Sequence, residues 1–77
     1  MKHVTVIVTW NDAHEQGGDV ATVAEINHAP DMQHTVGFLL RSDRVGITLA
    51  SERCEGGGWR TTNFIPRAMV VRVRRLR

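Results

Sequence analysis

The sequence lacks the features of a secreted, membrane-spanning or disulfide-bonded protein. It has one cysteine, Cys54, so no disulfide can form within the chain, and a free thiol in a cytoplasmic protein is the simplest interpretation. No apolar run approaches the roughly 20 residues that a membrane-spanning helix needs. The first residues, Met1 to His3, run directly into a strand-like pattern and do not have the layout of a signal peptide. We therefore expect a cytoplasmic protein.

Catalytic and metal-binding motifs are missing as well. The glycines Gly56–Gly58 are not followed by the Lys-Ser/Thr pair and helix of a phosphate-binding loop, so we interpret them as a flexible hairpin tip. No nucleophile elbow is present. Four histidines could gather around a metal: His3, His14, His28 and His34. Without closely spaced cysteines we expect no structural zinc site, and we expect no enzymatic activity and no cofactor.

Acidic residues are missing from the last part of the chain. All eight acids lie between Asp12 and Glu55, whereas nine of the ten basic residues come at or after Arg41. Six arginines follow Gly56, namely Arg60, Arg67, Arg72, Arg74, Arg75 and Arg77. A basic C-terminal half favours an anionic partner, such as a nucleotide, a nucleic acid or an acidic protein. The alternative is a solvated strand face, whose charges keep sheets from pairing edge to edge.

The length of the chain, 77 residues, is enough for one small domain. A chain this short buries only roughly 60–65% of the surface that it exposes when unfolded, so its core is thin. The apolar fraction of 42% is ordinary for a folded protein. Self-association is a common remedy for a thin core that has no disulfide or metal, and we therefore expect a homo-oligomer.

Alternating apolar and polar residues predict five short β-strands. The clearest alternation covers residues 3–10, where β-branched residues dominate. One face of this strand carries four apolar residues: Val4, Val6, Val8 and Trp10. The other predicted strands span residues 35–41, 45–52, 59–65 and 69–76. The second and third form a hairpin, in which Val45, Ile47 and Leu49 face the core.

The last predicted strand follows a sharp bend. Pro66 has no amide hydrogen and a fixed φ, so it suits the entry to a one-turn bend and not the middle of a sheet. Beyond the bend, Val71 and Val73 fall on one face, and Arg72 and Arg74 fall on the other. The pattern predicts a half-buried closing strand with a basic outer face.

The segment between the first two strands, residues 11–34, is the least regular. Gly17-Gly18 interrupts it and Pro30 ends any helix within it. Thr22 to Glu25 fits a capping box, in which the Thr22 hydroxyl accepts from the Glu25 amide and the Glu25 carboxylate reaches back. We expect one short helix near residues 22–28. A loop of this length without structure would indicate a functional segment.

The order of these elements resembles the SH3-like and Sm-like small barrels, which bend through one turn between their fourth and fifth strands. The chain also resembles small proteins encoded by bacteriophages. The matching segments are Trp10 to His14, Glu25 to Pro30, Val36 to Leu40 and Ile65 to Val70. The resemblance implies a phage origin and one mainly β domain over residues 1–77, a five-stranded SH3-like or Sm-like barrel with one short helix.

Two groups of residues are candidate binding sites. The first, a ligand-binding group, consists of Trp10, Asp12, His14 and Arg67. Asp12 and His14 lie two residues apart at a strand end, so a carboxylate and an imidazole can converge there. Arg67 follows the bend, from which its planar guanidinium could bind a phosphate. The second group is a nucleic-acid surface made of Arg60, Arg72, Arg74 and Arg75.

Each candidate also has a structural interpretation. Asp12 could satisfy turn amides, His14 could be solvent-exposed, and Arg67 could pair with an acid such as Asp12 or Glu25. Trp10 and Trp59 could stack on a base, or they could cap the thin core.

The preferred hypothesis is a non-enzymatic, oligomeric phage protein that binds an anionic small ligand. Several phage proteins of this size sequester nucleotide signals of host defence, and this analogy suggests a nucleotide. The alternatives are a nucleic-acid-binding barrel that uses the arginine-rich C-terminal strand, and an inhibitor that docks on a host protein through the exposed side of the first strand.

Overall fold

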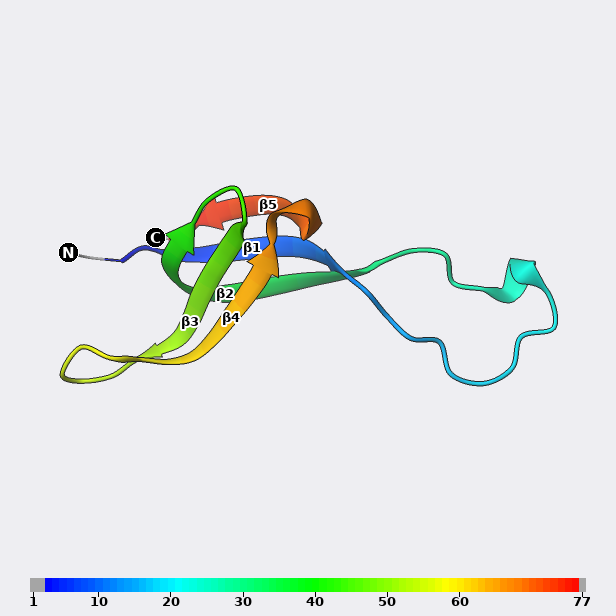
Figure 1. Cartoon of the computed structure of the whole chain (residues 1–77), viewed down its shortest axis with the longest axis horizontal. Coiled ribbons are helices and arrows are strands. Elements are labelled where there is room, and N and C mark those ends of the chain that lie inside the picture. Colours follow the sequence, from blue (N-terminus) through cyan, green and yellow to red (C-terminus); the bar gives the residue numbers. More distant parts are fainter. Residues whose placement is uncertain (1–2, 77) are drawn as a thin grey trace.

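The computed structural model describes residues 3–76, and its five strands form one antiparallel sheet (Figure 1). The strands are β1 Thr5–Asp12, β2 Asp31–Ser42, β3 Gly46–Arg53, β4 Trp59–Pro66 and β5 Val70–Arg75. Two 3-10 turns complete the elements, η1 Val23–Glu25 and η2 Arg67–Met69. The strand order is β4-β3-β2-β1-β5. The predicted mainly β class is therefore confirmed. The predicted barrel is not confirmed, because the sheet is open between its edge strands β4 and β5.

The core lies on one face of this sheet and has few members. Five side chains are at most 3% exposed and pack together: Val6, Val8, Ile47, Leu49 and Ile65. Val4 and Trp10 pack against this cluster, so the predicted apolar face of the first strand is confirmed. Alternate residues of a strand point to the same face, which is why the sequence pattern was sufficient here.

Three valines predicted to face inward are exposed instead. Val45 is 64% exposed because it belongs to the turn that precedes β3, and not to the strand itself. Val71 and Val73 are 53% and 42% exposed, so β5 is not half-buried as predicted. As an edge strand β5 pairs only with β1, and no further strand covers its valines.

The predicted short helix near residues 22–28 is present only as the single 3-10 turn η1. The capping box is also incomplete. The Glu25 carboxylate accepts from the Ala21 amide at 2.7 Å, whereas the Thr22 side chain makes no capping hydrogen bond. A helix this short needs an apolar face packed on the sheet, and Val23 is 83% exposed.

The segment that carries η1 projects from the sheet (Figure 1). The β1–β2 ladder continues to the pair Asp12 and Asp31, four residues beyond the predicted start of the second strand. Residues 13–30, which we call the arm, extend past that pair, and every one of them is exposed. The arm makes the molecule 55 Å long and 23 Å wide, with a radius of gyration of 16.1 Å. A compact chain of this length would have a radius of roughly 11–12 Å.

Within residues 3–76, no helix is long and apolar enough to cross a membrane.

Candidate functional site

Two of the predicted ligand residues meet in a shallow hollow at the base of the arm. Asp12 ends β1, and His14 follows it near the beginning of the arm. The hollow is lined by Asp12, Ala13, His14, Asn27, His28, Ala29 and Pro30. The His14 imidazole donates from Nε2 to the Asn27 carbonyl at 3.2 Å, and this bond joins the outgoing and returning segments of the arm. This lining includes no lysine or arginine that could bind an anion.

Trp10 and Arg67, the other two members of that group, lie elsewhere. The Trp10 indole packs against the core and donates from Nε1 to the Thr35 hydroxyl at 2.9 Å. The Arg67 guanidinium donates to the Asp43 carbonyl at 2.7 and 3.0 Å and to the Ser42 hydroxyl at 2.9 Å. Among the hydrogen bonds of residues 3–76, none links Arg67 to the base of the arm. Arg67 therefore has a structural role. Its partner is a backbone carbonyl and not the acidic side chain that the sequence suggested.

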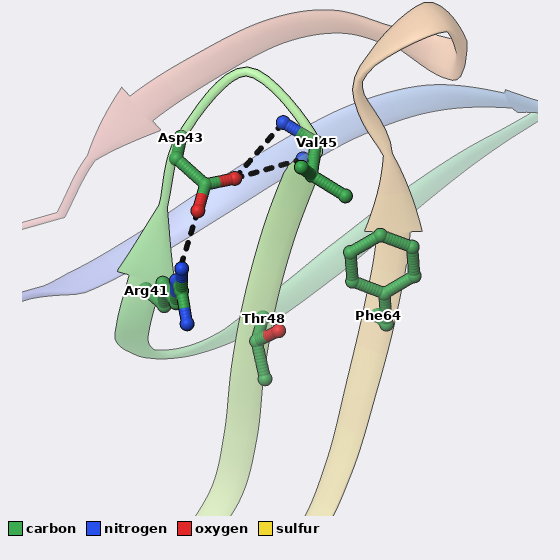
Figure 2. A pocket seen from close by; sticks show the side chains of 6 residues that line it. Arg41, Asp43, Val45, Thr48 and Phe64 are labelled. Atoms are coloured by element: carbon green, nitrogen blue, oxygen red, sulfur yellow. Dashed lines mark hydrogen bonds and ion pairs between the residues drawn. The ribbon is translucent and has the colours of Figure 1, made fainter.

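A second hollow, which the sequence did not predict, lies beside the turn between β2 and β3 (Figure 2). It has a volume of about 240 Å³ and is lined by Arg41, Asp43, Val45, Gly46, Thr48 and Phe64. Phe64 is 55% exposed and lies on the sheet surface beside Thr48, its partner across the β3–β4 ladder. A side chain at Gly46 would meet the Phe64 ring at 2.6 Å, so glycine is required for the ring to lie there.

Asp43 organises this turn with one carboxylate. Its Oδ1 accepts from the Val45 and Gly46 amides at 2.9 and 3.3 Å, and its Oδ2 accepts from Arg41 at 2.8 Å (Figure 2). These bonds, the Val45 amide first and the Arg41 side chain next, lower the pKa of Asp43 from its ordinary value of 3.8. Because Arg41 is paired with Asp43, this hollow carries little free positive charge.

The third candidate lies on the face of the sheet opposite the core, over β5, β1 and β2. The strand registers place its residues in two adjacent rows. One row runs Arg72, Thr9, His34, and the next runs Arg74, Ile7, Val36. We call these six residues the basic face. The Thr9 hydroxyl and His34 Nδ1 are hydrogen-bonded at 2.9 Å, and Val36 is 51% exposed.

The four predicted nucleic-acid arginines are thus divided by the fold. Arg72 and Arg74 are neighbours on the basic face and make no ion pair within the described residues. Arg75 pairs with Val6, whose side chain is in the core, so it belongs to the other side of β5. Arg60 lies on β4 at the far edge of the sheet, 3.7 Å from Glu52. This division follows from strand register and strand order, which a sequence pattern does not specify.

Trp59, the other predicted stacking residue, starts β4 and is enclosed by three side chains. The His3 ring meets it edge-on at a centroid distance of 4.9 Å, and the Phe38 ring lies 5.5 Å away. The Arg53 guanidinium carbon lies 5.5 Å from the centre of the indole ring. These contacts make Trp59 part of a small aromatic cluster at the end of the sheet away from the arm.

Among residues 3–76 no cluster of three or more His, Cys, Asp or Glu side chains could hold a metal ion. Comparison with family models, with curated proteins and with solved structures gave no match. The resemblance to phage-encoded proteins and to SH3-like or Sm-like barrels therefore stays a prediction.

Proposed function

We propose that this protein binds single-stranded nucleic acid on the basic face and does so without catalysis. The observation that supports this proposal is the pair of rows in which Arg72 and Arg74, neither of which makes an ion pair among residues 3–76, border a hydroxyl–imidazole pair and two apolar side chains. Both arginines are exposed on an edge strand, so a ligand reaches them without displacing another element.

The two arginines suit adjacent phosphates. Arg72 and Arg74 are two residues apart on one strand, which separates their Cα atoms by about 6–7 Å and directs both side chains to the same face. A guanidinium binds phosphate through paired N–H donors in a plane. Binding should therefore depend on salt, because each neutralised phosphate releases counterions.

The interior of the basic face suits unstacked bases. Ile7 and Val36 form its apolar row, and the His34 imidazole offers a flat ring next to it. Single-stranded ligands present bases that can lie on such a surface, whereas a duplex keeps its bases stacked inside. The described residues place no helix on this face that could enter a groove. We therefore favour a single strand over a duplex.

The nucleotide hypothesis has less support from the geometry. The hollow at Asp12 and His14 brings together a carboxylate and histidines, and an anion would have to approach the carboxylate there. Arg67, which was expected to supply the positive charge, already donates to Asp43 and Ser42. We therefore place the proposed anionic ligand on the basic face.

The remaining predictions complete the proposal. We propose that the protein self-associates, that the open sheet is a variant of the SH3-like or Sm-like barrel, and that it acts for a phage in the host cytoplasm. The strand order and the single turn η2 between β4 and β5 support the barrel relationship. The phage setting rests on the resemblance described for the sequence. A host-protein inhibitor would use the same outer side of β1, and it is the alternative if no nucleic acid binds.

The test is fluorescence anisotropy with labelled single- and double-stranded oligonucleotides over a range of salt. Arg72→Ala with Arg74→Ala should weaken single-strand binding tenfold or more. When the logarithm of the binding constant is plotted against the logarithm of the salt concentration, the slope should also become shallower by about 1.4, since each lost phosphate contact removes roughly 0.7. The control is Arg44→Ala with Arg60→Ala, which removes the same charge elsewhere and should change affinity little.

Two outcomes would contradict the proposal. Equal losses in both double variants would mean that only net charge matters. Absence of oligonucleotide binding, together with a salt-tolerant thermal shift from a mono- or cyclic nucleotide, would restore the nucleotide hypothesis.

A further inference from the structure

The arm has an organised shape although every one of its residues is exposed. The Gln16 side chain joins the outgoing and returning segments of the arm. It accepts from the Asn27 amide at 2.9 Å and donates to the Glu25 carbonyl at 3.3 Å. The His14–Asn27 bond and the turn η1 add to this bridge. A long loop held in shape by its own side chains is frequently a functional element.

The arm is also acidic and carries exposed apolar side chains. Residues 13–30 contain three acids, Glu15, Asp19 and Glu25, and neither lysine nor arginine. Val20, Val23 and Ile26 are 41%, 83% and 45% exposed. Apolar side chains gathered on one projecting segment favour contact with another protein surface.

The side of β5 away from the basic face has the complementary character. Val73 pairs with the buried Val8, and Arg75 pairs with the buried Val6. Both therefore lie on the core side of this edge strand. Val71, which is 53% exposed, precedes them in the register shift opposite Thr9 and Trp10. We call Val71, Val73 and Arg75 the open rim. It is apolar and basic, and the strand as a whole has three arginines and no acid.

The arm does not reach the open rim of its own chain. β5 begins opposite Trp10, close to the base of the arm, and runs antiparallel to β1. The arm and β5 therefore extend in opposite directions from nearly the same place (Figure 1). Contact within one chain would require the β1–β2 ladder to fold back at Asp12 and Asp31.

From this complementarity we infer that the arm of one copy docks on the open rim of a second copy. Val23 and Ile26 would cover the valines of the rim, and Glu15 and Asp19 would lie near Arg75. The smallest closed assembly is a pair that exchanges arms, because such a pair leaves neither an arm nor a rim uncovered. The inference rests on the proposed self-association and is independent of nucleic-acid binding, since Arg72 and Arg74 point to the other face.

The test compares the molar mass of full-length variants by light scattering, at several protein concentrations and two salt concentrations. The arm variant is Glu15→Gln, Asp19→Asn and Val23→Ser, and none of these side chains makes a hydrogen bond within the described residues. The rim variant is Val71→Thr, Val73→Thr and Arg75→Gln. The control, Arg44→Gln with Val45→Thr, removes an arginine and a 64% exposed valine from the β2–β3 turn.

The wild type and the control should be dimers that weaken at high salt. Either the arm or the rim variant should raise the dissociation constant tenfold or more while keeping its circular dichroism spectrum. A wild-type monomer at high concentration would overturn both the inference and the proposed self-association. A stable oligomer that neither variant weakens would overturn the arm contact alone, and it would point to direct pairing of the β4 and β5 edges.

Charge reversal keeps the inference testable if a variant folds poorly. Glu15→Lys with Asp19→Lys gives a basic arm, and Arg75→Glu replaces the one basic side chain of the rim with an acidic one. Each protein alone should dissociate, whereas their mixture should form a mixed dimer in which each arm meets a rim of opposite charge. Failure of the mixture to associate, with both proteins folded, would also overturn the inference. Binding of oligonucleotide, measured in parallel, should persist in all of these variants.

Discussion

At the scale of single residues, Asp43 connects two parts of the chain that are far apart in sequence. Its carboxylate holds the β2–β3 turn through the Val45 and Gly46 amides, and its carbonyl accepts from Arg67 in η2. The turn and η2 are further joined by the bond from the Arg67 amide to the Val45 carbonyl at 3.1 Å. A local Asx-type turn thus also anchors the bend that leads into β5.

The lowered pKa of Asp43 predicts a specific pH dependence. The folded protein binds this proton only at lower pH than the unfolded chain does, so the bonds of the ionised carboxylate contribute fully above the ordinary pKa of 3.8. Their contribution should decrease as the pH falls through the lowered pKa. The unfolding free energies of the wild type and Asp43→Asn, measured in urea, should differ at pH 7, and the difference should shrink as the pH is lowered below 3.8. A constant difference over this range would show that the charge of Asp43 is not responsible.

Thr61 supports a second residue-scale prediction, on the stability of β4. It has a φ of 57°, a left-handed conformation that is costly for a β-branched residue, and it falls between the ladder pairs of Arg60 and Thr62. Asparagine adopts this conformation more readily, so Thr61→Asn should stabilise the protein by about 1 kcal/mol in urea unfolding. Thr62→Asn is the matched control and should not stabilise. Equal effects would show that the conformation of Thr61 is not strained.

At the scale of elements, the sheet should fold without the arm. All of residues 13–30 are exposed, and Asp12 and Asp31 face each other across the ladder. Replacing residues 13–30 by Asn-Gly should therefore give a β-hairpin with the same strand register. At a protein concentration at which the wild type is monomeric, we expect a melting temperature equal to or above that of the wild type, because the deletion removes no core contact and shortens a long loop. A large decrease in melting temperature would mean that the arm stabilises the sheet.

Edge position explains why β5 differs from its prediction. Its alternation of valine and arginine is the pattern of a strand with one buried face, and the alternation itself is present. Burial requires a neighbouring element, however, and β5 has a partner on one side only. The register shift between Thr9 and Trp10 also interrupts the alternation at Val71, which has no partner in the β1–β5 ladder.

At the scale of the whole molecule, charge is separated along the 55 Å axis. The arm has only acids and histidines as ionisable groups, whereas nine arginines lie at or after Arg41 against three acids. A molecule with oppositely charged ends attracts a second copy in the antiparallel orientation, with each acidic arm beside the basic end of the other copy, and this attraction falls with salt. The separation is visible in the sequence, but its alignment with the long axis follows from the projection of the arm.

The sequence by itself determined the mainly β class, the approximate strands, the apolar face of β1 and the one-turn bend after Pro66. These features depend on residues close in the chain, through side-chain alternation and the fixed geometry of proline. Only the tertiary structure decided that the sheet is open, that Val71 and Val73 are uncovered, and that Arg72 and Arg74 lie together while Arg60 is at the far edge. Those features depend on strand order and register, which long-range backbone pairing establishes and local patterns do not specify.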